Sequence, residues 1–158
     1  KWTDGSDSSG ATYNRNQARF WAVGQPVDVE LHPGAVMRCT LASKTQPAAA
    51  DGNTVPGTLI DASAEIHRVS ANDSAEMTLS LRYSIGQDEQ TVKLTSIPGA
   101  YTSRHREESH NGAQRTERYT VASRFIGRDP LMPYLATSYT LHSPTAGVIS
   151  GIAVLRCS

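Results

Sequence analysis

The histidines and acids between Tyr101 and Thr116 come nearest to a spacing that could do catalytic or metal-binding chemistry. His105, Glu107 and His110 lie in one short run, HREESH. A zinc protease places its two histidines as HExxH on a helix, and this run does not have that spacing. Arginines on both sides of His105 oppose cation binding, and the nucleophile motif GxSxG is absent from the sequence. A secreted hydrolase is therefore the least favoured of three hypotheses, and we expect no enzyme, cofactor or metal.

The same stretch is rich in arginine and tyrosine, the residue types that often dominate binding interfaces. Half of the arginines lie between Arg104 and Arg128, interspersed with acids. Guanidinium groups bind carboxylate or sulfate groups through paired hydrogen bonds. The alternative is an ordinary solvated segment whose acids and bases neutralise one another. The residues predicted to contact a ligand are Tyr101, Arg104, Arg106, Arg115, Arg118 and Tyr119.

Charge and hydropathy narrow the range of partners. The chain has 158 residues, a length typical of one domain, with 15 basic and 15 acidic residues and a net charge of zero. A neutral protein has no overall field to attract nucleic acid or an anionic membrane. The longest apolar runs, such as Gly151 to Leu155, are too short to cross a bilayer. We therefore expect neither nucleic acid nor a membrane as a partner.

Turn-forming residues divide the chain into short segments in which apolar and polar residues alternate, a pattern typical of strands. The segment Glu76–Tyr83, EMTLSLRY, shows it most clearly. The other predicted strands are Phe20–Leu31, Ala35–Leu41, Thr91–Ile97, a segment around Tyr119 and Val121, Tyr134–His142 and Val148–Cys157. Residues 43–56 and 101–116 are predicted as exposed loops and residues 1–16 as a flexible arm. The pattern predicts an antiparallel immunoglobulin-like β-sandwich of about seven to nine strands over residues 17–158.

The two cysteines lie in phase with apolar residues of their strands, so both thiols are expected to face the core. Cys39 is in an early predicted strand and Cys157 in the last one. A disulfide between them would close a loop over most of the chain and contribute roughly 4 to 5 kcal/mol in the chain-entropy model. Such a bond indicates an oxidising compartment, whereas the alternative is a pair of unrelated buried thiols in a cytosolic protein.

Residues 134–158 resemble the closing strand pair of chaperone–usher fimbrial subunits, and Val23–Cys39 is similar to early strands of fimbrial adhesins. The resemblance implies an immunoglobulin-like sandwich that lacks one strand, which a periplasmic chaperone and then the next pilus subunit supply. Fimbrial disulfides usually join two early strands. The late position of Cys157 looks more like minor tip or invasin-type subunits.

The first sixteen residues bear on the position of such a subunit in a pilus. Lys1–Asn16 lacks the alternating apolar residues that a donated strand needs, so a chain beginning there would accept a strand without giving one. The resemblance then implies a tip adhesin, secreted through the periplasm to the cell surface, that binds a host glycan or protein receptor. The alternative hypothesis is a periplasmic inhibitor or immunity-type protein that blocks an enzyme with residues 101–116.

Overall fold

The regular secondary structure of the described residues consists of β-strands. Its computed structural model describes residues 5–6, 12–70, 72, 74–110 and 113–158; these ranges contain no helix, and hence none with the length and hydropathy that crossing a membrane requires. The strands are β1 (Gly5–Ser6), β2 (Thr12–Tyr13), β3 (Val36–Lys44), β4 (Ala48–Ala49), β5 (Thr58–His67), β6 (Glu76–Ile85), β7 (Asp88–Ser96), β8 (Tyr101–His110), β9 (Ala113–Ile126), β10 (Tyr134–Ser143) and β11 (Gly147–Cys157). The prediction of an all-β antiparallel fold is confirmed.

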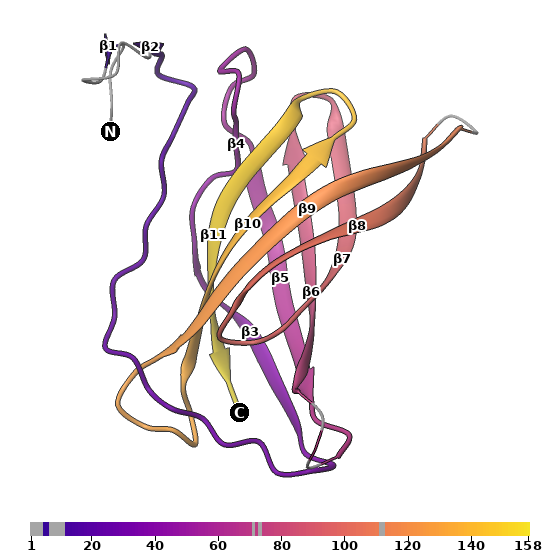
Figure 1. Ribbon diagram of the computed structural model, residues 1–158. Coiled ribbons are helices and arrows are strands. Elements are labelled where there is room, and N and C mark those ends of the chain that lie inside the picture. The colour runs from indigo at the N-terminus through magenta and orange to yellow at the C-terminus, as the bar shows by residue number, and fades with distance from the viewer. Residues whose placement is uncertain (1–4, 7–11, 71, 73, 111–112) are drawn as a thin grey trace.

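Nine strands form one antiparallel sheet, in which neighbours along the chain are mostly neighbours in space. Strands β3, β5, β6 and β7 form one meander and β8 to β11 form a second, and the pairing of β3 with β11 joins the two. The sheet curls until β7 approaches β8, so it is nearly closed (Figure 1). An immunoglobulin sandwich, in contrast, divides its strands between two sheets with Greek-key connections.

Alternation along the strands determines which side chains fill the interior. On β6, Met77, Leu79, Leu81 and Tyr83 are buried, whereas the residues between them are partly or fully exposed. Successive side chains of a strand point to opposite faces, so this pattern gives β6 one apolar face. The strongest alternation in the sequence therefore predicts β6 correctly.

The segment from residue 20 to residue 31 was expected to be a strand, and this prediction is wrong. It runs along the outside and across the lower end of the sheet, attached to the end of β9 by an isolated bridge (Figure 1). Val27, Val29 and Leu31 pack against the core cluster, while Asp28 and Glu30 are exposed. The alternation thus reflects one-sided burial of an extended segment without a strand partner along its length.

Among the described residues, five strands lie where the sequence predicts none: β1 and β2 within the predicted arm of residues 1–16, β8 within the predicted loop of residues 101–116, and β4 and β5. β5 has a register shift between Leu59 and Asp61, and its inward residues include the small Ala62 and Ala64, so its apolar alternation is weak. β4 lies within the predicted loop at residues 43–56, which is a correction to that prediction. Its alanines are buried because β4 pairs with β11.

The disulfide between Cys39 and Cys157 is present and confirms the predicted bridge. The two cysteines are directly opposite each other on β3 and β11, and both are buried. Backbone hydrogen bonds between Arg38 and Ser158 extend this pairing by one residue. The bond joins the first and last long strands of the sheet and is compatible with a secreted or periplasmic protein.

Tyr139 shows how tightly the interior is packed. It lies opposite Gly151 on β11, and a Cβ atom at Gly151 would be 2.5 Å from the Tyr139 hydroxyl. Burial raises the pKa of the Tyr139 phenol, and the neighbouring Tyr83 raises it further. The phenol is therefore protonated at physiological pH and serves as a packing group.

Candidate functional site

The β8–β9 hairpin is the part of the sheet that projects furthest from the body (Figure 1). Its strands pair continuously from the Tyr101–Ala122 pair to the His110–Ala113 pair. The prediction of a loop over residues 101–116 is therefore wrong. The segment is polar because the outer half of this two-stranded hairpin projects beyond the core, where its side chains have no apolar surface to cover.

The inner face of the hairpin closes the core. Thr102, Tyr119 and Val121 lie on it and are buried. The Tyr119 hydroxyl donates a hydrogen bond to the Thr95 carbonyl oxygen (2.8 Å) and accepts one from the Thr95 N–H (3.0 Å). Tyr119 was predicted as a ligand contact, and this prediction is wrong because the side chain bridges β9 to β7 inside the fold.

Two of the predicted arginines share this inner face. Arg104 is opposite Tyr119 and Arg106 is opposite Glu117, and both arginines are half-buried. A guanidinium nitrogen of Arg104 lies 3.6 Å from a carboxylate oxygen of Glu76 on β6. These arginines therefore cannot form one contact surface with the residues of the opposite face.

The outer face of the hairpin includes Tyr101, Ser103, His105 and Arg118, all exposed. The Tyr101 side chain is 67% exposed despite its size. The Arg118 Nε–H donates a hydrogen bond to the Ser103 hydroxyl oxygen (2.9 Å), which fixes the guanidinium group on the strip between Tyr101 and His105. Two of the six predicted contacts, Tyr101 and Arg118, thus lie together on this face.

Several predicted groups lie partly outside the described residues. The structure does not describe the side chains of His110 and Arg115, so these two predictions lie outside the described part of the chain. His105 and Glu107 have a described placement on the outer face. Among described residues, no three His, Cys, Asp or Glu side chains form a group that could hold a metal ion.

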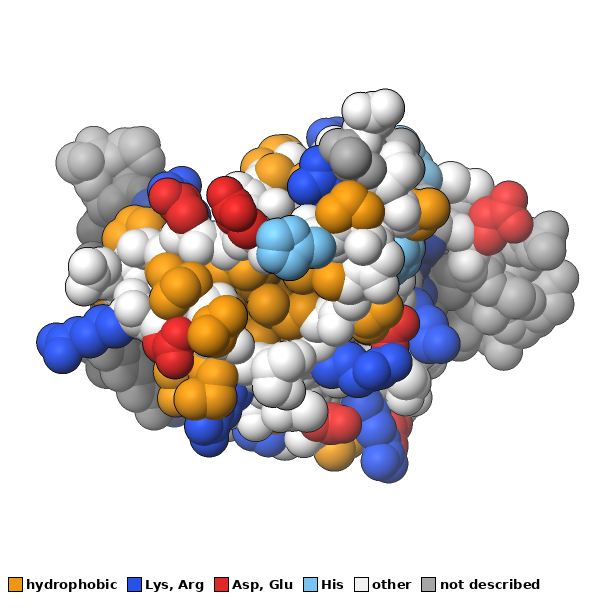
Figure 2. All heavy atoms as spheres, turned by 90° about the horizontal axis from the view of Figure 1, so that it is seen from below, with side chains coloured by type: hydrophobic (Ala, Val, Ile, Leu, Met, Phe, Trp, Pro, Cys, Tyr) orange, Lys and Arg blue, Asp and Glu red, His pale blue; other side chains and the backbone are white. Residues whose placement is uncertain are grey.

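A pocket of about 830 Å³ lies at the lower end of the sheet. In the view from below in Figure 2, hydrophobic side chains floor a hollow, with histidine and acidic side chains beside it. Residues 27–33, here called the strap, form one wall. The residues that line the interior include Val29, Leu31, Ser74, Pro98 and Phe125.

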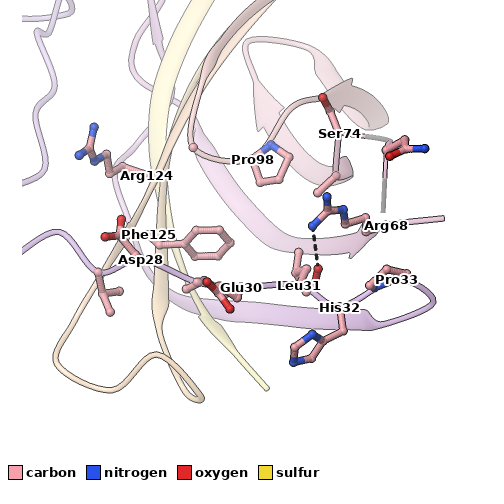
Figure 3. Close-up of a pocket in the computed structure, with 15 residues that line it drawn as sticks. Asp28, Glu30, Leu31, His32, Pro33, Arg68, Ser74, Pro98, Arg124 and Phe125 are labelled. Atoms are coloured by element: carbon pink, nitrogen blue, oxygen red, sulfur yellow. Dashed lines mark hydrogen bonds between the residues drawn. The ribbon is translucent and has the colours of Figure 1, made fainter. Parts of the chain in front are cut away.

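The side chains around this lower pocket differ in whether they point into it. The Phe125 ring points into the pocket, and the Arg68 guanidinium donates a hydrogen bond to the Leu31 carbonyl oxygen (3.3 Å) across it (Figure 3). His32 points away from the pocket interior (Figure 3). The sequence offered one signal for this pocket, the alternation of residues 27–31, which predicts a strand instead.

Comparison with protein families, curated proteins and solved structures finds no match for this chain. The function must therefore be argued from the geometry. The outer face presents an aromatic ring and an oriented guanidinium group, whereas the lower pocket has an arginine already bonded to its own strap. The outer face is the stronger candidate.

Proposed function

We propose that this protein is an exported binding protein whose outer face recognises an acidic glycan. The observation that carries the proposal is the hydrogen bond from Arg118 to Ser103, which orients a guanidinium group on the same face as the exposed ring of Tyr101. Neither Tyr101 nor Arg118 contributes to the core. Their placement is useful for binding and unnecessary for folding.

The chemistry of these two side chains suits a sulfated or sialylated sugar. The remaining N–H groups of Arg118 can donate paired hydrogen bonds to one sulfate or carboxylate group. The Tyr101 ring offers a flat apolar face against which a sugar ring can pack. Because Ser103 already restrains Arg118, less conformational entropy is lost on binding.

The fimbrial hypothesis adds a requirement that bears on this proposal. A strand-accepting subunit needs a gap in its sheet with core side chains open to the donor strand. The gap in this sheet lies between β7 and β8, where Tyr119 bonds to Thr95 and the side chains of Leu94 and Val121 are buried. These contacts favour a self-contained binding domain over a subunit that awaits a donated strand.

The inhibitor hypothesis uses the same hairpin in a different way. A projecting hairpin can enter the active-site cleft of an enzyme, and its tip would then make the contacts. The glycan proposal is favoured because Tyr101 lies at the base of the hairpin and Arg118 midway along it, so neither is at its tip.

Binding to immobilised heparin and to a sialylated oligosaccharide tests the proposal. Arg118→Ala and Tyr101→Ala should each weaken binding roughly tenfold, as hot-spot truncations do. Arg104→Ala removes the same charge from the opposite face and is the matched control, with no expected loss. The proposal fails if the wild type binds neither probe, or if Arg104→Ala weakens binding as much as Arg118→Ala.

A further inference from the structure

β8 is an end strand of the sheet, and half of its backbone groups point away from its neighbour. The Ser123 N–H donates to the Ala100 carbonyl oxygen (3.1 Å), which sets the phase of the β8–β9 ladder. Antiparallel pairing alternates, so Arg104 and Arg106 direct their N–H and C=O groups toward β9. His105 and Glu107 then direct theirs outward, along the free edge.

Only the lower part of this edge approaches β7. There the Ile97 N–H donates to the Thr102 hydroxyl oxygen (3.2 Å), and Tyr119 bonds to Thr95. Beyond these contacts the hairpin extends past the body of the sheet (Figure 1). An exposed row of unpaired backbone groups is a template for another strand.

The charges along β8 indicate which strand fits this edge. Residues 104–106, RHR, carry the basic side chains, and residues 107–108, EE, carry the acidic ones. A second copy of the same strand in antiparallel orientation places the acidic half of each copy against the basic half of the other. A parallel copy would align like charges, which destabilises a strand pair.

We propose that two copies of this protein pair through the free edges of their β8 strands, antiparallel and centred on Arg106. Directly opposed residues share a face, so His105 of each copy lies against Glu107 of the other on the outer face. The two Arg106 residues meet on the inner face, where each is opposite Glu117 of its own hairpin. The carboxylate of Glu117 offsets the repulsion between them.

The pairing has a consequence for ligand binding. It joins two sheets edge to edge and brings two outer faces side by side. If the outer face binds a glycan as proposed above, a repeating polymer is held at two points, which raises the overall affinity. The self-pairing itself rests only on the edge and its charges, so it stands or falls independently of glycan binding.

A charge-reversal rescue, followed by sedimentation velocity over a series of protein concentrations, tests the proposal. The wild type should show a monomer–dimer equilibrium that weakens with salt. Glu107→Lys replaces the carboxylate opposite His105 with an ammonium group in both copies, which removes two favourable contacts and should weaken association about tenfold or more. The double variant His105→Glu with Glu107→Lys restores two opposite-charge pairs and should restore the dimer.

A backbone control separates edge pairing from side-chain effects. His105→Pro removes an outward N–H and should also give a monomer, with the thermal unfolding of each variant showing that it is folded. A wild type that is monomeric at every concentration overturns the proposal, and leaves the edge to a strand of another protein. A folded double variant that remains monomeric also overturns it.

Discussion

The two meanders of the sheet meet at two places, between β3 and β11 and between the end strands β7 and β8, and different interactions join them there. Each of these places is here called a seam. At β3–β11 a backbone ladder and the Cys39–Cys157 disulfide join the first and last long strands. At β7–β8 side chains take over, with Tyr119 bonded to Thr95 and Thr102 to Ile97. The disulfide and the ladder join β3 to β11 firmly. At the other seam β8 is held by few side-chain hydrogen bonds, and with β9 it projects from the sheet as a hairpin.

The difference follows from the direction of the strands. β8 and β9 diverge from β7 as they project, so backbone groups of the two edges cannot meet along their length (Figure 1). A tyrosine hydroxyl can donate and accept at once, and it satisfies both backbone groups of Thr95. On this account, the β3–β11 seam provides stability, whereas the hairpin beside the β7–β8 seam provides the proposed binding surface.

Removing the disulfide should have the largest effect on stability. The bond closes a loop with a sequence separation of 118 residues. The double variant Cys39→Ser with Cys157→Ser should lower the free energy of unfolding by about 4 kcal/mol, measured by urea denaturation. Wild type with its disulfide reduced is the matched control and should behave alike. A loss below about 1 kcal/mol would show that the β3–β11 ladder needs no covalent bond.

Opening the side-chain seam should have a smaller effect. Tyr119→Phe leaves the N–H and C=O of Thr95 without the hydroxyl that satisfies them, at a cost of about 1 to 2 kcal/mol. Tyr101→Phe removes an exposed hydroxyl from the same hairpin and should change stability little. Equal unfolding midpoints for the two variants in urea would contradict the assigned role of Tyr119.

Much of the fold can be predicted from the sequence, because one-sided burial produces alternation. It identifies β6 and β11, and the phase of the cysteines identifies the disulfide. β5 escapes because its inward positions include alanines and its register shifts at Leu59. Residues 20–31 mislead because alternation reports burial on one side and says nothing of a strand partner.

The binding surface was harder to predict than the fold. Composition identifies the arginine-rich stretch but not its faces, since these depend on the register of β8 against β9. That register separates Arg118 from Arg104 and buries Tyr119. The lower pocket is lined by four segments that are far apart in the sequence, and no local sequence pattern predicts that they lie together.

Hydrogen–deuterium exchange in β8, at low and high protein concentration, tests most directly whether the hairpin carries an open edge. At low concentration the amides of His105 and Glu107 should exchange fast while those of Arg104 and Arg106 are protected by β9. At high concentration, pairing between copies should slow the first two amides. Slow exchange of His105 and Glu107 at every concentration, or fast exchange at every concentration, would contradict the account.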